Sequence, residues 1–246
     1  MRIAFRIRNF KTVFLVALAA LTLPVRAQQI SPNGVKHMPR SKMQVRPWHP
    51  FPQHVTYAPG TIRPDHRSQA EQDADMVAIY EAWKSRYLVP TGTEPDGHPR
   101  YRILHHRDPA SDTVSEGMGY GMMIVAYMAG HEPEARTIFD GLYEYVLDHP
   151  SVNGPGLMDW DVPADESPTP PEEDSAFDGD ADIAFSLLVA SAQWGNRGRF
   201  NYRAESRRVL DAIMLRTVGE HSNLALLGDW VNEPGDEYDE YDARTS

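Results

Sequence analysis

Apolar residues recur three and four positions apart along much of this chain, and that spacing constrains its fold more than any other feature. A residue at every third or fourth position returns to the same face of an α-helix, so the pattern predicts amphipathic helices. No stretch of useful length alternates between apolar and polar residues, which is the pattern of a half-buried strand. The sequence therefore predicts an all-α protein, built from helical hairpins that are joined by long loops.

The first two predicted helices have clear starts or stops. The first begins at Ser68, where Glu71 three residues later completes a capping box. We expect one face of this helix to be buried, formed by Ala70, Ala74, Val77, Tyr80, Trp83 and Tyr87. The second runs over residues 115–129 and stops at Gly130.

Three further helices follow. One starts at Pro133, a residue allowed in the first helical turn, and ends before His149. The next spans residues 180–194, with Gly195 as its stop. Its buried side is predicted to hold Ile183, Leu187, Leu188, Ser191 and Trp194. Asn201 can cap the last helix, whose apolar residues are Tyr202, Val209, Ile213 and Leu215.

The remaining segments are predicted to be irregular. Residues 28–66 contain seven prolines, which forbids a helix and indicates an extended arm or linker. Residues 150–177 are rich in proline and acids and are expected to form a loop. Residues 229–242 hold seven acidic residues and are expected to form a surface loop. This leaves residues 67–246 as the folded domain.

Residues 1–27 have the pattern of a secretory signal peptide. Five basic residues and no acidic one accompany an apolar run from Val13 to Leu23, and the segment ends in small residues with cleavage expected after Ala27. The alternative is a membrane anchor, but a span needs about 20 apolar residues. We expect a secreted or periplasmic protein that has no membrane contact after cleavage.

Composition excludes several classes of function. A net charge of −11 argues against nucleic-acid and anionic-membrane partners, because both bind basic surfaces. The absence of cysteine excludes disulfides, thiolate catalysis and zinc–thiolate sites. The motifs HExxH, GxSxG, GxGxxG and the P-loop are also absent, so we expect no metal ion and no organic cofactor.

Two segments place carboxylates at the starts of apolar helices. Residues 113–122 contain Glu116 among three glycines, which suits close approach by another helix or a ligand. Residues 176–185 contain Asp178, Asp180 and Asp182; the alternative of a calcium loop fails because the EF-hand glycine and glutamate are missing. If the two helix starts converge, their acids suit hydrolysis of a glycosidic bond, which needs two carboxyl groups.

A tryptophan lies between these two segments. Trp160 is flanked by Asp159 and Asp161, and an exposed indole beside acids is suited to pack on a sugar ring while the acids accept hydroxyl hydrogen bonds. A core anchor is nearly as good an interpretation of this tryptophan from the sequence alone.

These motifs resemble glycoside hydrolase family 8, which comprises bacterial inverting endoglucanases, chitosanases, lichenases and xylanases. Residues 115–122 are similar to the segment around the family's general acid, which implies that role for Glu116. Residues 176–194 resemble the family signature, with Phe177 where Ser or Thr is usual, and Asp178 would lie in the sugar subsite beside the cleaved bond. Residues 156–162 resemble the substrate loop, and substrate contacts are expected from Trp160, Tyr120 and Asp180.

The resemblance implies an (α/α)6 barrel, of which this chain would form the N-terminal half to two-thirds. The implied activity is endo-acting hydrolysis of β-1,4-linked polysaccharide with inversion, on cellulose or β-glucan by default, with xylan or chitosan as other substrates. The family's catalytic base would fall beyond Ser246, since Asp242 lies too early in the chain. The alternatives are a non-catalytic carbohydrate-binding protein and an inactive truncated barrel. We expect a monomer.

Overall fold

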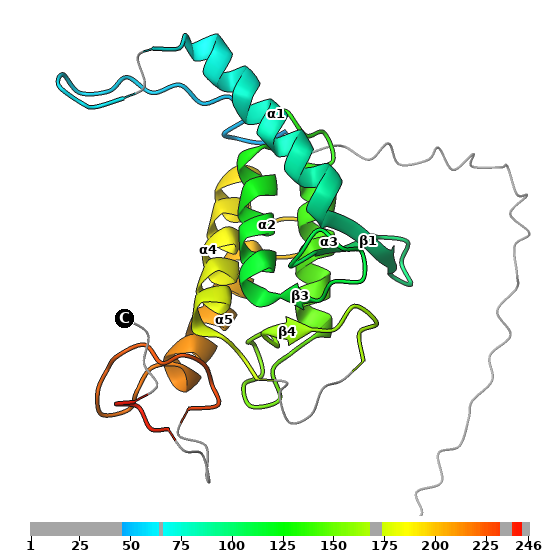
Figure 1. Cartoon of the computed structure of the whole chain (residues 1–246), viewed down its shortest axis with the longest axis vertical. Helices are drawn as coiled ribbons and strands as arrows, with labels where there is room; N and C mark the ends of the chain where they lie inside the picture. Colours follow the sequence, from blue (N-terminus) through cyan, green and yellow to red (C-terminus); the bar gives the residue numbers. More distant parts are fainter. Residues whose placement is uncertain (1–45, 64–65, 168–173, 232–237, 243–246) are drawn as a thin grey trace, which may run out of the picture. The chain divides into compact units, whose positions relative to one another are not determined.

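The computed structural model describes residues 46–63, 66–167, 174–231 and 238–242, and helices are the main regular structure in this part of the chain (Figure 1). The predicted signal peptide and residues 28–45 of the predicted arm lie outside it. The helices are α1 (Gln69–Tyr87), α2 (Ser115–Tyr127), α3 (Ala135–Asp148), α4 (Phe177–Trp194) and α5 (Tyr202–Arg216). The strands are β1 (Leu88–Thr93), β2 (Pro99–Ile103), β3 (Thr113–Val114) and β4 (Asp161–Val162).

The predicted helix ends agree best with the structure where a capping residue or a stop glycine determines them. Ser68 and Glu71 form the capping box of α1, with both reciprocal hydrogen bonds present. Gly195 ends α4 with φ +69°, and the Asn201 side chain accepts a hydrogen bond from the Ala204 N–H at the start of α5. Three boundaries differ: α2 ends at Tyr127, α3 begins at Ala135 and α4 begins three residues early, at Phe177.

The prediction of a helical fold is confirmed, but two small antiparallel sheets that were not predicted are also present. Strands β1 and β2 form a hairpin with a register shift between Pro90 and Gly92, and β3 pairs with β4. Proline and glycine within β1 hid the strand pattern. The hairpin packs against α3 through Gly141, where a Cβ atom would lie 2.4 Å from the Pro99 carbonyl oxygen.

Helices α2 to α5 enclose the main hydrophobic core. Helix α4 packs between α2 and α5, and α3 packs against α2 and β2. An aromatic cluster of Phe139, Trp194 and Tyr202 joins α3, α4 and α5 at ring-centroid distances of 5.4–6.1 Å, with Phe139 edge-to-face to both other rings. The fully buried apolar side chains include Met118, Met122, Val125, Phe139, Leu142, Tyr143, Ile183 and Leu187.

Several residues predicted to be buried are exposed. In α1 only Tyr80 is fully buried, while Ala70 and Ala74 are exposed, because no described element covers the first half of that helix. Leu188 in α4 is 43% exposed and Leu215 in α5 is 74% exposed. These positions have the correct helical spacing, but the structure leaves much of their surface open to solvent.

Two segments predicted to be irregular are held in place by specific contacts. Residues 46–63 contain no helix or strand, yet Gln193 of α4 binds both the N–H and the carbonyl of His49 through its side-chain amide. In the acidic segment 229–242, Asp229 is 2% and Glu240 4% exposed, so the prediction of a simple surface loop is wrong for these two acids. No helix in the described ranges is long and apolar enough to cross a lipid bilayer.

Candidate active site

The starts of α2 and α4 lie against each other because glycine occupies the contact points. A Cβ atom on Gly179 would lie 2.1 Å from the Ser115 hydroxyl oxygen and 2.7 Å from the Glu116 nitrogen. A Cβ atom on Gly119 would lie 2.5 Å from the Asp182 Cβ. Only a residue without a side chain fits at either position, so Gly119 and Gly179 serve helix–helix contact. The contact brings the two acid-bearing helix starts together.

Three carboxylates and one phenol gather at this contact. Tyr120 lies one helical turn after Glu116, and the neighbouring Glu116 carboxylate raises the pKa of Tyr120. Burial raises the pKa of Asp182, and the negative charges of Asp178 and Glu116 raise it further. Glu116, Asp178 and Tyr120 are exposed, so the cluster is open to a ligand. The structure thus brings together Glu116, Asp178 and Tyr120, as predicted.

The loop over residues 156–162, the Trp160 loop, is fixed beside this cluster. The Ser115 N–H donates to the Trp160 carbonyl at 3.0 Å, and the Trp160 N–H donates to the Asp174 carbonyl at 2.8 Å. The pairing of β3 with β4 also holds the end of the Trp160 loop against α2, because α2 follows β3 directly and Glu116 is its second residue. The Trp160 side chain is 41% exposed, which contradicts the core-anchor interpretation. An exposed indole therefore lies at the helix start that carries Glu116.

Asp180 differs from the other predicted site residues. It is 0% exposed, and one of its carboxyl oxygens accepts a hydrogen bond from the Met158 N–H at 2.9 Å. Burial raises its pKa to about 8. In this structure Asp180 is covered, unlike the exposed Glu116, Asp178 and Trp160, so its predicted contact with substrate stays a prediction. Asp182, which was not among the predicted site residues, is at the cluster instead.

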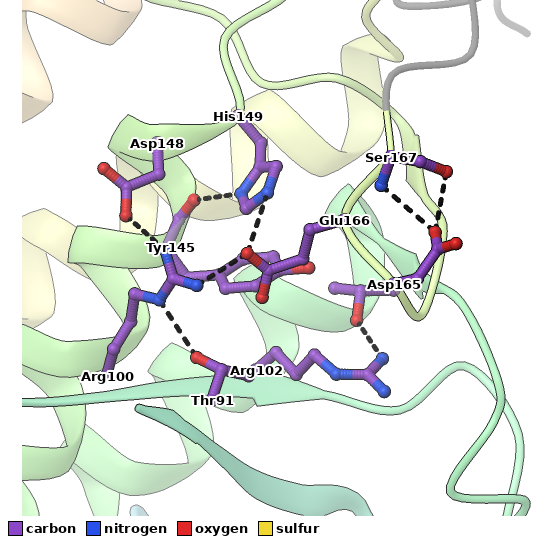
Figure 2. Close-up of polar contacts among 10 residues, drawn as sticks. Thr91, Arg100, Arg102, Tyr145, Asp148, His149, Asp165, Glu166 and Ser167 are labelled. Atoms are coloured by element: carbon purple, nitrogen blue, oxygen red, sulfur yellow. Dashed lines mark hydrogen bonds and ion pairs between the residues drawn. The ribbon is translucent and has the colours of Figure 1, made fainter. Parts of the chain in front are cut away.

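The segment that follows the Trp160 loop is anchored by Arg100 of β2 (Figure 2). The Arg100 guanidinium donates to Asp148 and to Glu166, each at 2.6 Å, and its Nε donates to the Thr91 hydroxyl at 3.0 Å. His149 lies over the Tyr145 ring, and its Nε2 is 3.8 Å from Glu166. This network ties the end of α3 and the hairpin to the residues that follow β4.

No group of three or more His, Asp or Glu side chains in the described residues is arranged to hold a metal ion. The site consists of carboxyl groups, a phenol and an indole. Such a site can donate a proton, accept hydrogen bonds from hydroxyl groups and pack on a sugar ring.

The family model for glycosyl hydrolases family 8 matches residues 67–238. This chain belongs to that family. The matched residues contain Glu116, Tyr120, Trp160, Asp178 and Asp182, so the candidate site is part of the family 8 region.

Curated relatives and a solved structure agree with this membership. A beta-glucanase of Niallia circulans is 38% identical over 223 residues, which cover 91% of this chain and 49% of the relative. An endoglucanase of Bacillus sp. (strain KSM-330) is 39% identical over 184 residues, covering 74% and 39%. The apo structure of a beta-1,3-1,4-glucanase from Paenibacillus sp. X4 superposes with a TM-score of 0.69 at 41% identity, covering 75% of this chain and 47% of that one. This family 8 chain spans half or less of the length of these relatives.

Proposed function

We propose that this chain carries the general-acid side of a glycoside hydrolase active site that cleaves β-linked glucan with inversion of configuration. The convergence of Glu116, Asp178 and Tyr120 beside the exposed Trp160 supports the proposal most directly. The names of the relatives, beta-glucanase and endoglucanase, favour a β-glucan over xylan or chitosan and favour endo-acting cleavage.

In the proposed reaction Glu116 protonates the glycosidic oxygen as the bond to the leaving sugar breaks. Tyr120, one helical turn after Glu116 and close enough for the Glu116 carboxylate to raise its pKa, orients this carboxyl group. Asp178 accepts hydrogen bonds from hydroxyl groups of the sugar beside the cleaved bond, and the exposed face of Trp160 packs on a neighbouring ring. An inverting reaction also needs a base that activates water on the opposite face of the sugar. We assign none of the described residues to that role.

We propose in addition that the helices of this chain belong to an (α/α)6 barrel. Two helix starts that together form a site, with further helices packed outside them, are what such a barrel requires. The exposed apolar residues of α4 and α5 would then face helices of the remaining barrel. The signal-like segment over residues 1–27 supports export of the protein from the cell.

The reaction is tested with the full chain and soluble mixed-linkage β-glucan. Proton NMR of the first-formed reducing ends should show the α-anomer, because inversion of a β-linkage gives that product. A first-formed β-anomer would contradict inversion. Binding of the glucan without any release of reducing ends would contradict hydrolysis by this chain and favour a carbohydrate-binding protein.

A further inference from the structure

The carboxyl group of Asp180 is buried, and only one of its two oxygens has a hydrogen-bond partner among the described residues. Its carboxyl group is 0% exposed, and the Met158 N–H is its one donor within hydrogen-bond distance among the described residues. The second carboxyl oxygen has no partner in the described part of the chain, and the same is true of the buried Ser175 hydroxyl. Ser175 and the Met158 N–H each act to lower the pKa of Asp180, and burial outweighs both. A proton on the free carboxyl oxygen would allow this oxygen to pair with the Ser175 hydroxyl.

The charges around Asp180 are negative. Asp229, from the segment after α5, and Asp178, from α4 itself, both raise the pKa of Asp180, after burial as the larger cause. The Arg216 stem, from α5, lies beside Gly154 near Asp229. Within the described residues Arg216 forms no ion pair with either acid. An ionised Asp180 would therefore be a buried charge without a cation, which is costly.

We propose that Asp180 is a positioning residue that, as a neutral acid, holds the Trp160 loop on the start of α4. Its bond to Met158 lies two residues before Trp160, whose own backbone is bonded to Ser115 and Asp174. Asp180 thus connects the exposed indole to the helix that carries Asp178. This inference rests on the proposed function, in which Trp160 and Asp178 contact the same polysaccharide.

Asp229 links two further segments that lie near the Trp160 loop, through Ser151 and Ser175. One of its carboxyl oxygens accepts from the Ser175 N–H at 2.7 Å, and the other accepts from the Ser151 hydroxyl at 2.5 Å. The segment that precedes the Trp160 loop and the segment that precedes α4 are therefore both bonded to one carboxylate. Asp180 and Asp229 together link three stretches of chain, and Asp180 is the one bonded directly to the Trp160 loop.

A neutral buried acid makes this attachment depend on pH in a defined direction. Asp180 has a pKa of about 8 when the loop is closed, and once solvent reaches it the pKa returns to about 4, the ordinary value for Asp. At any pH between these two pKa values, opening of the loop therefore releases one proton from Asp180. The equilibrium constant for opening should rise as pH rises, by up to about tenfold per pH unit, and should level off above about pH 8.

Hydrogen exchange at the Met158 amide in the full chain measures this opening, after correction for the intrinsic exchange rate. We expect the opening constant of the wild type to rise about tenfold per pH unit between pH 5 and pH 7, with the Leu142 amide in α3 as internal reference.

Asp180→Asn keeps an acceptor for Met158 and cannot ionise, so its opening constant should not change with pH. Asp180→Ala removes the acceptor and should lose protection at every pH. The control is Asp211→Asn, an exposed α5 residue, which should behave as the wild type.

A wild-type opening constant that does not depend on pH, or an Asp180→Asn variant with the wild-type slope, would overturn the proposal. Activity on β-glucan gives a second readout. Asp180→Ala should lower kcat/KM by roughly tenfold or more, since misplaced binding groups are costly, and Asp180→Asn should restore it. If the wild type releases no reducing ends, the proposed function fails, but the exchange experiment still decides the role of Asp180.

Discussion

Glycine at two positions sets how closely the acid-bearing helix starts approach. Gly179 and Gly119 each face backbone or Cβ atoms of the opposite helix at distances that no side chain tolerates. Gly117, in the same α2 motif, differs, because its nearest neighbour is the Val114 side chain at 3.5 Å. Glycines that look equivalent in the sequence therefore serve different purposes, and substitution distinguishes them.

Gly179→Ala should destabilise the protein by roughly 1–3 kcal/mol, because the new methyl group would overlap Ser115 and the Glu116 backbone. Gly117→Ala is the matched control: it has ordinary van der Waals contacts, and alanine is favoured over glycine in a helix by about 1 kcal/mol. Urea unfolding of both variants measures the difference. Equal effects of the two substitutions would show that α2 and α4 do not approach as described.

The buried Asp140 in α3 should make the stability of the folded protein depend on pH, separately from the effect of Asp180 on loop opening. Burial raises its pKa to about 6, and it accepts a hydrogen bond from the Tyr202 hydroxyl at 2.5 Å. Since the folded state binds a proton that the unfolded state releases, the stability that Asp140 contributes falls as pH rises from about 4 to about 6. Asp140→Asn should therefore gain stability relative to the wild type across this window, by up to roughly 3 kcal/mol.

Thermal unfolding of both proteins from pH 4 to pH 7 checks this expectation. The difference in Tm should grow with pH and become constant above about pH 6. A difference that is the same at every pH would mean that Asp140 does not change its protonation on folding.

Among the secondary-structure elements, the network around Arg100 holds the residues after β4 to the hairpin and to α3 (Figure 2). The Arg100 side chain is 18% exposed and bonds two carboxylates, whereas the ion pair of Arg207 with Asp211 on α5 is exposed on both sides, at 76% and 62%. Ion pairs contribute more where water and salt screen them less.

Arg100→Met should lower the free energy of unfolding by about 1 kcal/mol or more at low salt, and the loss should shrink in high salt. Arg207→Met serves as the control and should change stability by less than about 0.5 kcal/mol. Urea unfolding at two NaCl concentrations tests both variants. Equal losses in the two variants would contradict a structural role for the Arg100 network.

The elements that local residues determine were predictable, and those that distant contacts determine were not. The capping box at Ser68 and the stop at Gly195 fix helix ends by themselves. The β1–β2 hairpin was missed because Pro90 and Gly92 break its alternation. At the site, the sequence placed Glu116 and Asp178 at two helix starts, and the packing of α2 on α4 through Gly119 and Gly179 brings these starts together.

The assignment of Asp180 and Asp182 did not follow from the acids alone. Asp178 and Asp182 are four residues apart and share a helix face, whereas Asp180 is two residues from each and faces away. Helical spacing alone therefore predicts that Asp180 faces away from Asp178 and Asp182. That Asp180 would be covered depended on the packing of the Trp160 loop and the segment around Asp229, and no local pattern in the sequence shows that packing.

For the whole molecule, the main observation is that the chain spans about half the length of the curated relatives it matches. Large apolar side chains are exposed on several of its helices, including Ile79, Phe185, Leu188, Met214 and Leu215. Contiguous exposed apolar surface marks places where other chain segments pack. The proposed barrel accounts for both observations, and it leaves the acid-bearing helix starts intact within this chain.

Release of reducing ends from mixed-linkage β-glucan by the wild type and by Glu116→Gln tests the central claim most directly. Glu220→Gln, an exposed glutamate after α5, is the matched control. The account predicts that Glu116→Gln lowers kcat by about a hundredfold or more, because glutamine cannot protonate the leaving oxygen, while Glu220→Gln keeps the wild-type rate. A Glu116→Gln variant as active as the wild type would contradict the assignment of the general acid.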